Sequence, residues 1–117
     1  MMRIRNREIF DMHAELCRTL SNSKRLMIIT ILFHKTELNV GEIATVVGAP
    51  ITNISQHLRA LKNQEIVTSR KDGQTVFYRL TDDRLVQACE TLRKVLLDRM
   101  RERGRIASDL EPIVDDS

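Results

Sequence analysis

Apolar residues recur along much of the chain at three- and four-residue steps, the spacing of one face of an amphipathic helix. Residues 7–20 follow this spacing, and the repeated positions hold Ile9, Phe10, His13, Leu16, Cys17 and Leu20. Residues 24–34 are almost continuously apolar, which predicts a second helix at the centre of the core. The short polar side chains at 21–23 can cap its first turn.

Two further helices are predicted next, joined by a tight turn. Asn39 and Glu42 have the spacing of a capping pair for a short helix, and Gly48 ends that helix. Pro50 can begin the following helix, residues 50–63, because the backbone N–H that proline lacks has no hydrogen-bond partner in the first turn of a helix.

After Gln64 the pattern changes to a period of two, which is typical of strands. Val76, Tyr78 and Leu80 fall on one face of the predicted strand, and they alternate with Thr75, Phe77 and Arg79. The pair Asp72-Gly73 precedes this run and accepts the positive φ values of a tight turn. We therefore predict a two-stranded hairpin with basic residues near its tip.

A last helix, residues 82–103, is predicted from an apolar stripe of Leu85, Cys89, Leu92, Leu96 and Met100. Gly104 ends it, and the remainder is short, acidic and interrupted by Pro112. The predicted organisation is one domain over 1–103, followed by a loose acidic tail over 104–117.

Composition narrows the class of protein. The chain has 117 residues, of which 42% are apolar, enough for a single core. The formal net charge is +3, and because residues 104–117 carry one arginine and four carboxylates, residues 1–103 hold +6. A basic domain permits a polyanionic partner. The N-terminus lacks a targeting signal, and no apolar run approaches the ~20 residues that cross a bilayer, so we expect a cytoplasmic protein with no membrane partner.

The order of elements predicts a mainly α fold with a small β-hairpin, the winged helix-turn-helix. In the second helix of the motif, Ile54, Leu58 and Leu61 share one face and should face the core. The polar residues left on or near the outer surface are Thr52, Asn53, Ser55, Gln56 and Arg59. Hydroxyl, carboxamide and guanidinium groups can bond base edges in the major groove, and no carboxylate occurs in residues 50–64.

The wing adds Arg70, Lys71 and Arg79, which can neutralise phosphates. A polar helix face or a basic hairpin alone would equally fit a surface that keeps a small domain in solution. Their succession after a capped short helix favours binding to double-stranded DNA.

The stretches "LCRTLSNSKRLMIITIL" and "ELNVGEIATVVGAPITNISQHLRALKNQEIVTSRKDGQTVFYRL" resemble the ArsR/SmtB family of winged-helix repressors, over residues 16–100. The resemblance implies a homodimer formed by the first and last helices, which binds an inverted-repeat operator and releases it when an inducer binds. It implies base contacts at Ile51, Thr52, Ser55 and Gln56, with His57 beside them. The full predicted DNA-binding set is Ile51, Thr52, Asn53, Ser55, Gln56, His57, Arg59, Lys62, Arg70, Lys71 and Arg79.

The chain departs from the family where metals are sensed. Many members carry Cys-Val-Cys where this chain has Asn39 and Gly41, neither of which supplies a thiolate. A second family site corresponds to Asp82, Arg84, Val95 and Asp98. Since arginine and valine cannot replace carboxylate or imidazole, we predict no metal site. Pro50 and Ile51 also replace the usual serine cap and a polar contact residue, which implies a different operator.

Cys17 and Cys89 lie on or beside the apolar stripes of the first and last helices. They can act as small packing residues. Alternatively they form a redox or thiophilic sensor, which would require Cα atoms within about 7 Å. Relatives that sense thiols place their pair at positions matching Thr30 and Leu97, which weakens the analogy. The inducer therefore stays unknown.

No glycine-rich phosphate loop, metal-hydrolase motif or nucleophile elbow occurs, so neither an enzyme nor a cofactor is expected. The three histidines, His13, His34 and His57, lack ligand spacing. An alternative to a DNA-binding regulator is a winged-helix protein-interaction module. That alternative leaves Thr52, Ser55 and Gln56 without a role.

Overall fold

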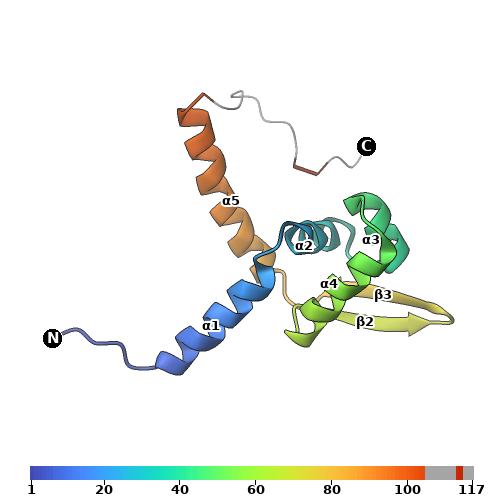
Figure 1. Ribbon diagram of the computed structural model, residues 1–117, viewed down its shortest axis with the longest axis horizontal. Helices are drawn as coiled ribbons and strands as arrows, with labels where there is room; N and C mark the ends of the chain where they lie inside the picture. Colours follow the sequence, from blue (N-terminus) through green and yellow to red (C-terminus); the bar gives the residue numbers. More distant parts are fainter. Residues whose placement is uncertain (105–112, 115–117) are drawn as a thin grey trace. The chain divides into compact units, whose positions relative to one another are not determined.

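The computed structural model describes residues 1–104, 113 and 114, and most of the predicted acidic tail lies outside them. The elements in these residues are α1 (Arg7–Leu20), α2 (Ser23–Lys35), β1 (Leu38–Asn39), α3 (Val40–Val47), α4 (Ile51–Asn63), β2 (Val67–Asp72), β3 (Thr75–Leu80) and α5 (Arg84–Glu102) (Figure 1). The chain divides into two compact units, Met1–Thr81 and Asp82–Ser117. The domain boundary at residue 103 stays a prediction.

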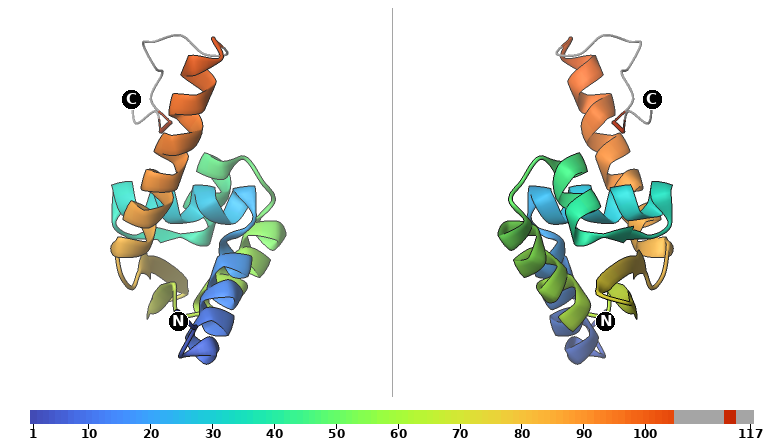
Figure 2. Two further views of the ribbon diagram at one scale, coloured as in Figure 1. Left: turned by 90° about the vertical axis from the view of Figure 1, so that its left-hand side faces the viewer. Right: turned by 90° about the vertical axis from the view of Figure 1, so that its right-hand side faces the viewer.

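Helix α2 forms the centre of the first unit. Its residues Ile28, Ile29, Ile31 and Leu32 are buried, and α3, α4 and β3 all contact the helix. The Asn22 side chain caps it by accepting hydrogen bonds from the backbone N–H groups of Lys24 and Arg25. Figure 2 shows α2 above both α4 and the hairpin. The prediction that this apolar stretch is the core helix is confirmed.

The helix-turn-helix is fixed by capping residues that could be predicted from the sequence. The Asn39 side chain accepts from the Glu42 N–H at 2.9 Å, and the Glu42 carboxylate accepts from the Asn39 N–H at 3.0 Å. Gly48 ends α3 with φ 78°, a left-handed conformation that glycine adopts without strain. Pro50 caps α4 with extended ψ 146°, so the helix begins at Ile51, one residue later than predicted.

The three strands form one antiparallel sheet in the order β1-β3-β2. The two-residue strand β1 was not predicted. Asp72 pairs with Thr75, so the hairpin turn consists of Gly73 and Gln74, and of these only Gly73 has a positive φ, 64°. The predicted turn was therefore wrong by one residue, because a turn of the II′ pattern needs positive φ only at its first central position.

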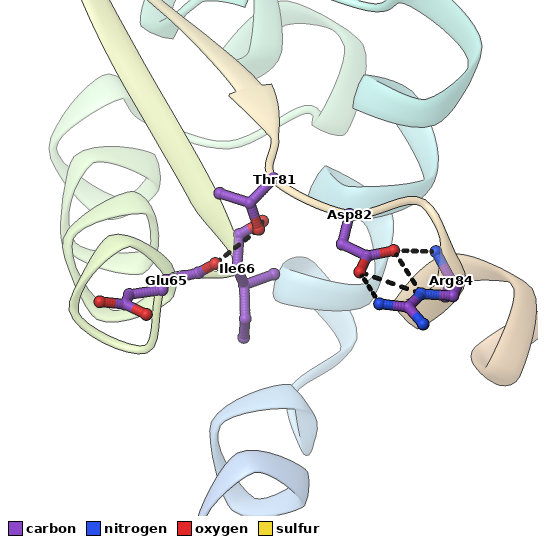
Figure 3. Close-up of polar contacts among 5 residues, drawn as sticks. All are labelled: Glu65, Ile66, Thr81, Asp82 and Arg84. Carbon is purple, nitrogen blue, oxygen red and sulfur yellow. Dashed lines mark hydrogen bonds and ion pairs between the residues drawn. The ribbon is translucent and has the colours of Figure 1, made fainter.

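Thr81 closes the base of the hairpin (Figure 3). Its hydroxyl donates to the carbonyl oxygens of Glu65 at 2.5 Å and Ile66 at 3.1 Å, and its N–H also donates to Ile66. Glu65 has φ 59°, which lets the chain turn sharply from α4 into β2. These contacts fix the start of the wing beside the end of α4.

Candidate nucleic-acid interface

Helix α4 is held by one apolar face. Ile54, Leu58 and Leu61 are essentially without solvent exposure, as their i, i+4, i+7 spacing predicted. Thr52, Gln56 and Arg59 are exposed, and Ser55 is half-buried. The inner face therefore orients the helix and leaves hydrogen-bonding groups on its surface.

Two residues predicted on this surface are less available than the others. Asn53 is half-buried, and its Oδ1 is buried without a hydrogen-bond partner in the described part of the chain. His57 is also half-buried, and its Nδ1 accepts a hydrogen bond from Arg25 Nε at 3.0 Å. DNA contact by either residue stays a prediction.

Arg25 links three helices around His57. Its Nη1 donates to the Thr19 carbonyl oxygen at 3.0 Å near the end of α1, while its Nε bonds His57 on α4. Burial lowers the pKa of His57, and the charges of Arg25 and Lys24 lower it further. A neutral His57 keeps the lone pair that accepts from Arg25.

The cations of the wing do not form one patch. Strand side chains alternate between faces, and cross-strand partners share a face. Lys71 lies on the same face as Ser69, whose hydroxyl oxygen accepts from Lys62 Nζ of α4 at 2.7 Å. Arg70 and Arg79 lie on the opposite face, since they pair with Phe77 and Thr68. Only Lys71 therefore shares the face on which α4 packs.

Arg70 is already engaged by a carboxylate. Its guanidinium donates three hydrogen bonds of 2.7–3.1 Å to Glu37 and lies 4.8 Å from the centre of the Phe77 ring. Asp72 is 3.8 Å away. Arg70 holds the pKa of Glu37 below its ordinary value. The prediction that Arg70 contacts phosphate is untested, and in the free chain such a contact competes with Glu37.

Sequence reasoning missed Glu37, which is placed by a strained turn. Thr36 has φ 70° and ψ −55°, and the Glu37 N–H donates to the Lys35 carbonyl oxygen at 2.8 Å across it. This is a γ-turn of the rare, strained kind, and a β-branched residue adopts it at a cost. Nothing in the local sequence pattern reveals a pair formed across 33 positions.

Three of the positions that match the family's metal sites, Asn39, Asp82 and Arg84, take part in other interactions. Asp82 accepts hydrogen bonds from Arg84 at both carboxylate oxygens, which lowers the pKa of Asp82 to about 2 (Figure 3). The Asn39 side chain belongs to the capping box. Within residues 1–104, 113 and 114, no cluster of three histidine, cysteine, aspartate or glutamate side chains could hold a metal ion.

Helices α1 and α5 each carry apolar side chains that are exposed to solvent. Ile9, Phe10 and Met12 of α1 are each more than half exposed, and α1 has no buried residue. On α5, Leu92 and Leu96 are 73% and 57% exposed. Solvent-exposed apolar stripes on helices indicate surfaces that a partner covers.

The thiols lie on these same two helices. Cys17 is exposed in the single chain, so the interpretation of Cys17 as a buried packing residue requires a partner molecule. Cys89 is half-buried on α5.

None of the helices in the described part of the chain has the length and apolar character needed to cross a membrane.

Comparison with known proteins agrees with this arrangement. The sequence model of the family described as "Bacterial regulatory protein, arsR family" matches residues 22–69. The HTH-type transcriptional regulator KmtR of Mycobacterium tuberculosis is 37% identical over 73 residues, which are 62% of this chain and 55% of KmtR. The transcriptional activator HlyU of Vibrio cholerae is 34% identical over 80 residues, 68% of this chain and 73% of HlyU. The chain thus spans little more than half of KmtR.

A solved structure shows the same fold. The homodimeric winged helix-turn-helix DNA-binding domain of Mb0332 from Mycobacterium bovis is 31% identical to the chain. The superposition covers 84% of this chain and 89% of that one, with a TM-score of 0.65. The winged helix-turn-helix predicted from the sequence is confirmed, and the relatives are transcriptional regulators rather than enzymes.

Proposed function

Because the chain belongs to the ArsR family of bacterial transcriptional regulators, we propose that it is a repressor that binds an inverted-repeat operator as a homodimer. The observation that carries this proposal is the outer surface of α4. It presents exposed hydrogen-bonding groups, and no carboxylate lies between residues 50 and 64. Such a surface suits a major groove, whose edges offer donors and acceptors between rows of phosphates.

The proposed contacts fall into two classes. Gln56, Thr52 and Ser55 read base edges, since carboxamide and hydroxyl groups both donate and accept. Arg59 and Lys71, both exposed, contact phosphates that flank the groove. The hydrogen bond from Lys62 to Ser69 holds the recognition helix against the wing.

The homodimer rests on the apolar stripes of α1 and α5 and on the homodimeric state of the Mb0332 domain. A two-fold dimer presents two copies of α4, and helix-turn-helix dimers bind half-sites about 34 Å apart, one helical turn. The operator should therefore be an inverted repeat.

The direction of regulation is a separate part of the proposal. A repressor needs only to occupy the promoter, whereas the relative HlyU is named an activator. A reporter gene with the bound promoter decides the direction of regulation.

A gel shift with the reduced protein tests the proposal, using duplexes selected from random DNA. We expect a salt-sensitive complex on one sequence class and a loss of ~1–3 kcal/mol of discrimination in Gln56→Ala. Gln64→Ala is the matched control, because Gln64 is an exposed glutamine that caps the far end of α4. Equal binding to all sequences by a stable dimer would support the protein-interaction module instead.

A further inference from the structure

The turn between α3 and α4 exposes apolar side chains at the entry to the recognition helix. Val46, near the end of α3, is 58% exposed, and Ile51, the first residue of α4, is 53% exposed. Pro50 between them is also exposed. Every other large apolar residue of α4 is buried, so Ile51 is not placed by the packing of that helix.

The backbone places these side chains around one short turn. Gly48 and Ala49 both donate to the Ala44 carbonyl oxygen, at 2.9 and 3.1 Å, which ends α3 and turns the chain toward α4. Helical side chains lean toward the N-terminus of their helix, so Ile51 leans back over the turn. We call the exposed surface of Val46, Pro50 and Ile51 the entry patch.

The entry patch has neither charge nor a hydrogen-bonding side chain, which limits what it can recognise. In the major groove the one apolar group on a base edge is the C5-methyl group of thymine. The first residues of a recognition helix are those that reach base edges. A protein partner is disfavoured, because three side chains fall far short of the ~1,200 Å² that a specific interface buries.

We infer that Ile51 contacts the C5-methyl group of a thymine in each operator half-site. This inference rests on the proposed function and adds to it one base, thymine, and the residue that contacts it, Ile51. The entry patch continues directly into the polar surface that begins at Thr52. Apolar contact therefore selects thymine at one position, while hydrogen bonds from the next turn of α4 select its neighbours.

Deoxyuridine substitution tests the inference, because deoxyuridine differs from thymidine only by the absent methyl group. Each thymine of a selected half-site is replaced in turn, and affinity is measured by fluorescence anisotropy. For the wild type we expect one position to lose about fourfold, equivalent to ~0.8 kcal/mol at 1.4 kcal/mol per factor of ten. In Ile51→Ala the same replacement should have almost no effect. Ile113→Ala, the same change at an exposed isoleucine outside the recognition helix, is the matched control and should keep the full methyl dependence.

The outcomes separate the two proposals. Sequence-specific binding that tolerates deoxyuridine at every position, or a methyl dependence that survives in Ile51→Ala, overturns the role of Ile51 and leaves the regulator intact. Absence of sequence-specific binding by the wild type overturns the proposed function itself. Ile51→Ala should melt at the wild-type temperature because its side chain is exposed, and circular dichroism verifies that the variant is folded.

Discussion

The ion pair between Glu37 and Arg70 determines how many phosphates the wing can neutralise. Three hydrogen bonds and the Phe77 ring hold the guanidinium on the face of the sheet opposite Lys71. In the free chain this cation is already compensated, so it releases no counterion when DNA binds. Glu37→Gln removes the compensating charge with little change of shape and frees Arg70 for phosphate.

The magnitude follows from counterion release. Each phosphate contact contributes about 0.9 to the slope of log affinity against log salt, or about 3.5-fold in affinity between 50 and 200 mM. We therefore expect Lys71→Ala to lower the slope by ~0.9 and Arg70→Ala to leave it nearly unchanged. Glu37→Gln should raise the slope by up to ~0.9.

Anisotropy titrations of a random duplex at several salt concentrations measure these slopes. Glu90→Gln, the same change of charge at an exposed position of α5, controls for net charge alone. A wild-type slope in Glu37→Gln, or a slope lowered by ~0.9 in Arg70→Ala, would refute the conclusion that Glu37 occupies Arg70 in the free chain.

Three further predictions follow from the same contacts. Thr36→Gly should stabilise the fold by ~1 kcal/mol in denaturant titrations, because glycine adopts the positive φ of the γ-turn without strain, and a destabilised variant would contradict the strained turn. His57 has a pKa below its ordinary 6.5, so the unfolded chain binds the proton more readily and the free energy of unfolding should fall as pH drops below about 6.5. His57→Gln keeps an acceptor for Arg25 and should flatten this dependence in thermal melts between pH 7 and 5; an unchanged profile assigns it to other groups. If Cys17 senses oxidants, diamide should weaken operator binding by about 5- to 150-fold in the wild type and not in Cys17→Ser. The same loss in both proteins would exclude that thiol.

The elements that could be predicted from the sequence are those with local causes. The capping pair of Asn39 and Glu42, the glycine at 48 and the spacing of Ile54 and Leu58 each act within a few residues. These interactions depend on neighbours along the chain, so α3, its turn and the inner face of α4 were predicted with errors of one residue at most. The same locality explains why the outer surface of α4 was largely foreseen.

The features that were missed depend on register and on distant partners. Strand β1 has two residues and exists because β3 offers it an edge, with Leu38 opposite Tyr78. That pairing places Glu37 beside Arg70, and the packing of α2 against α4 places Arg25 beside His57. The sequence prediction treated Arg70, Lys71 and Arg79 as one group of cations, but the strand register places Lys71 on one face of the hairpin and the two arginines on the other. Long-range pairing, which no local spacing encodes, therefore decides which predicted contacts are available.

We propose that the outer surface of α4 reads DNA sequence as part of a two-fold dimer. Hydroxyl-radical footprinting of the reduced protein on a selected duplex tests this proposal. We expect two protected segments centred about 34 Å apart, both abolished when Thr52, Ser55 and Gln56 are replaced together by alanine. Even protection along the whole duplex, or a footprint that survives in the triple variant, would contradict it.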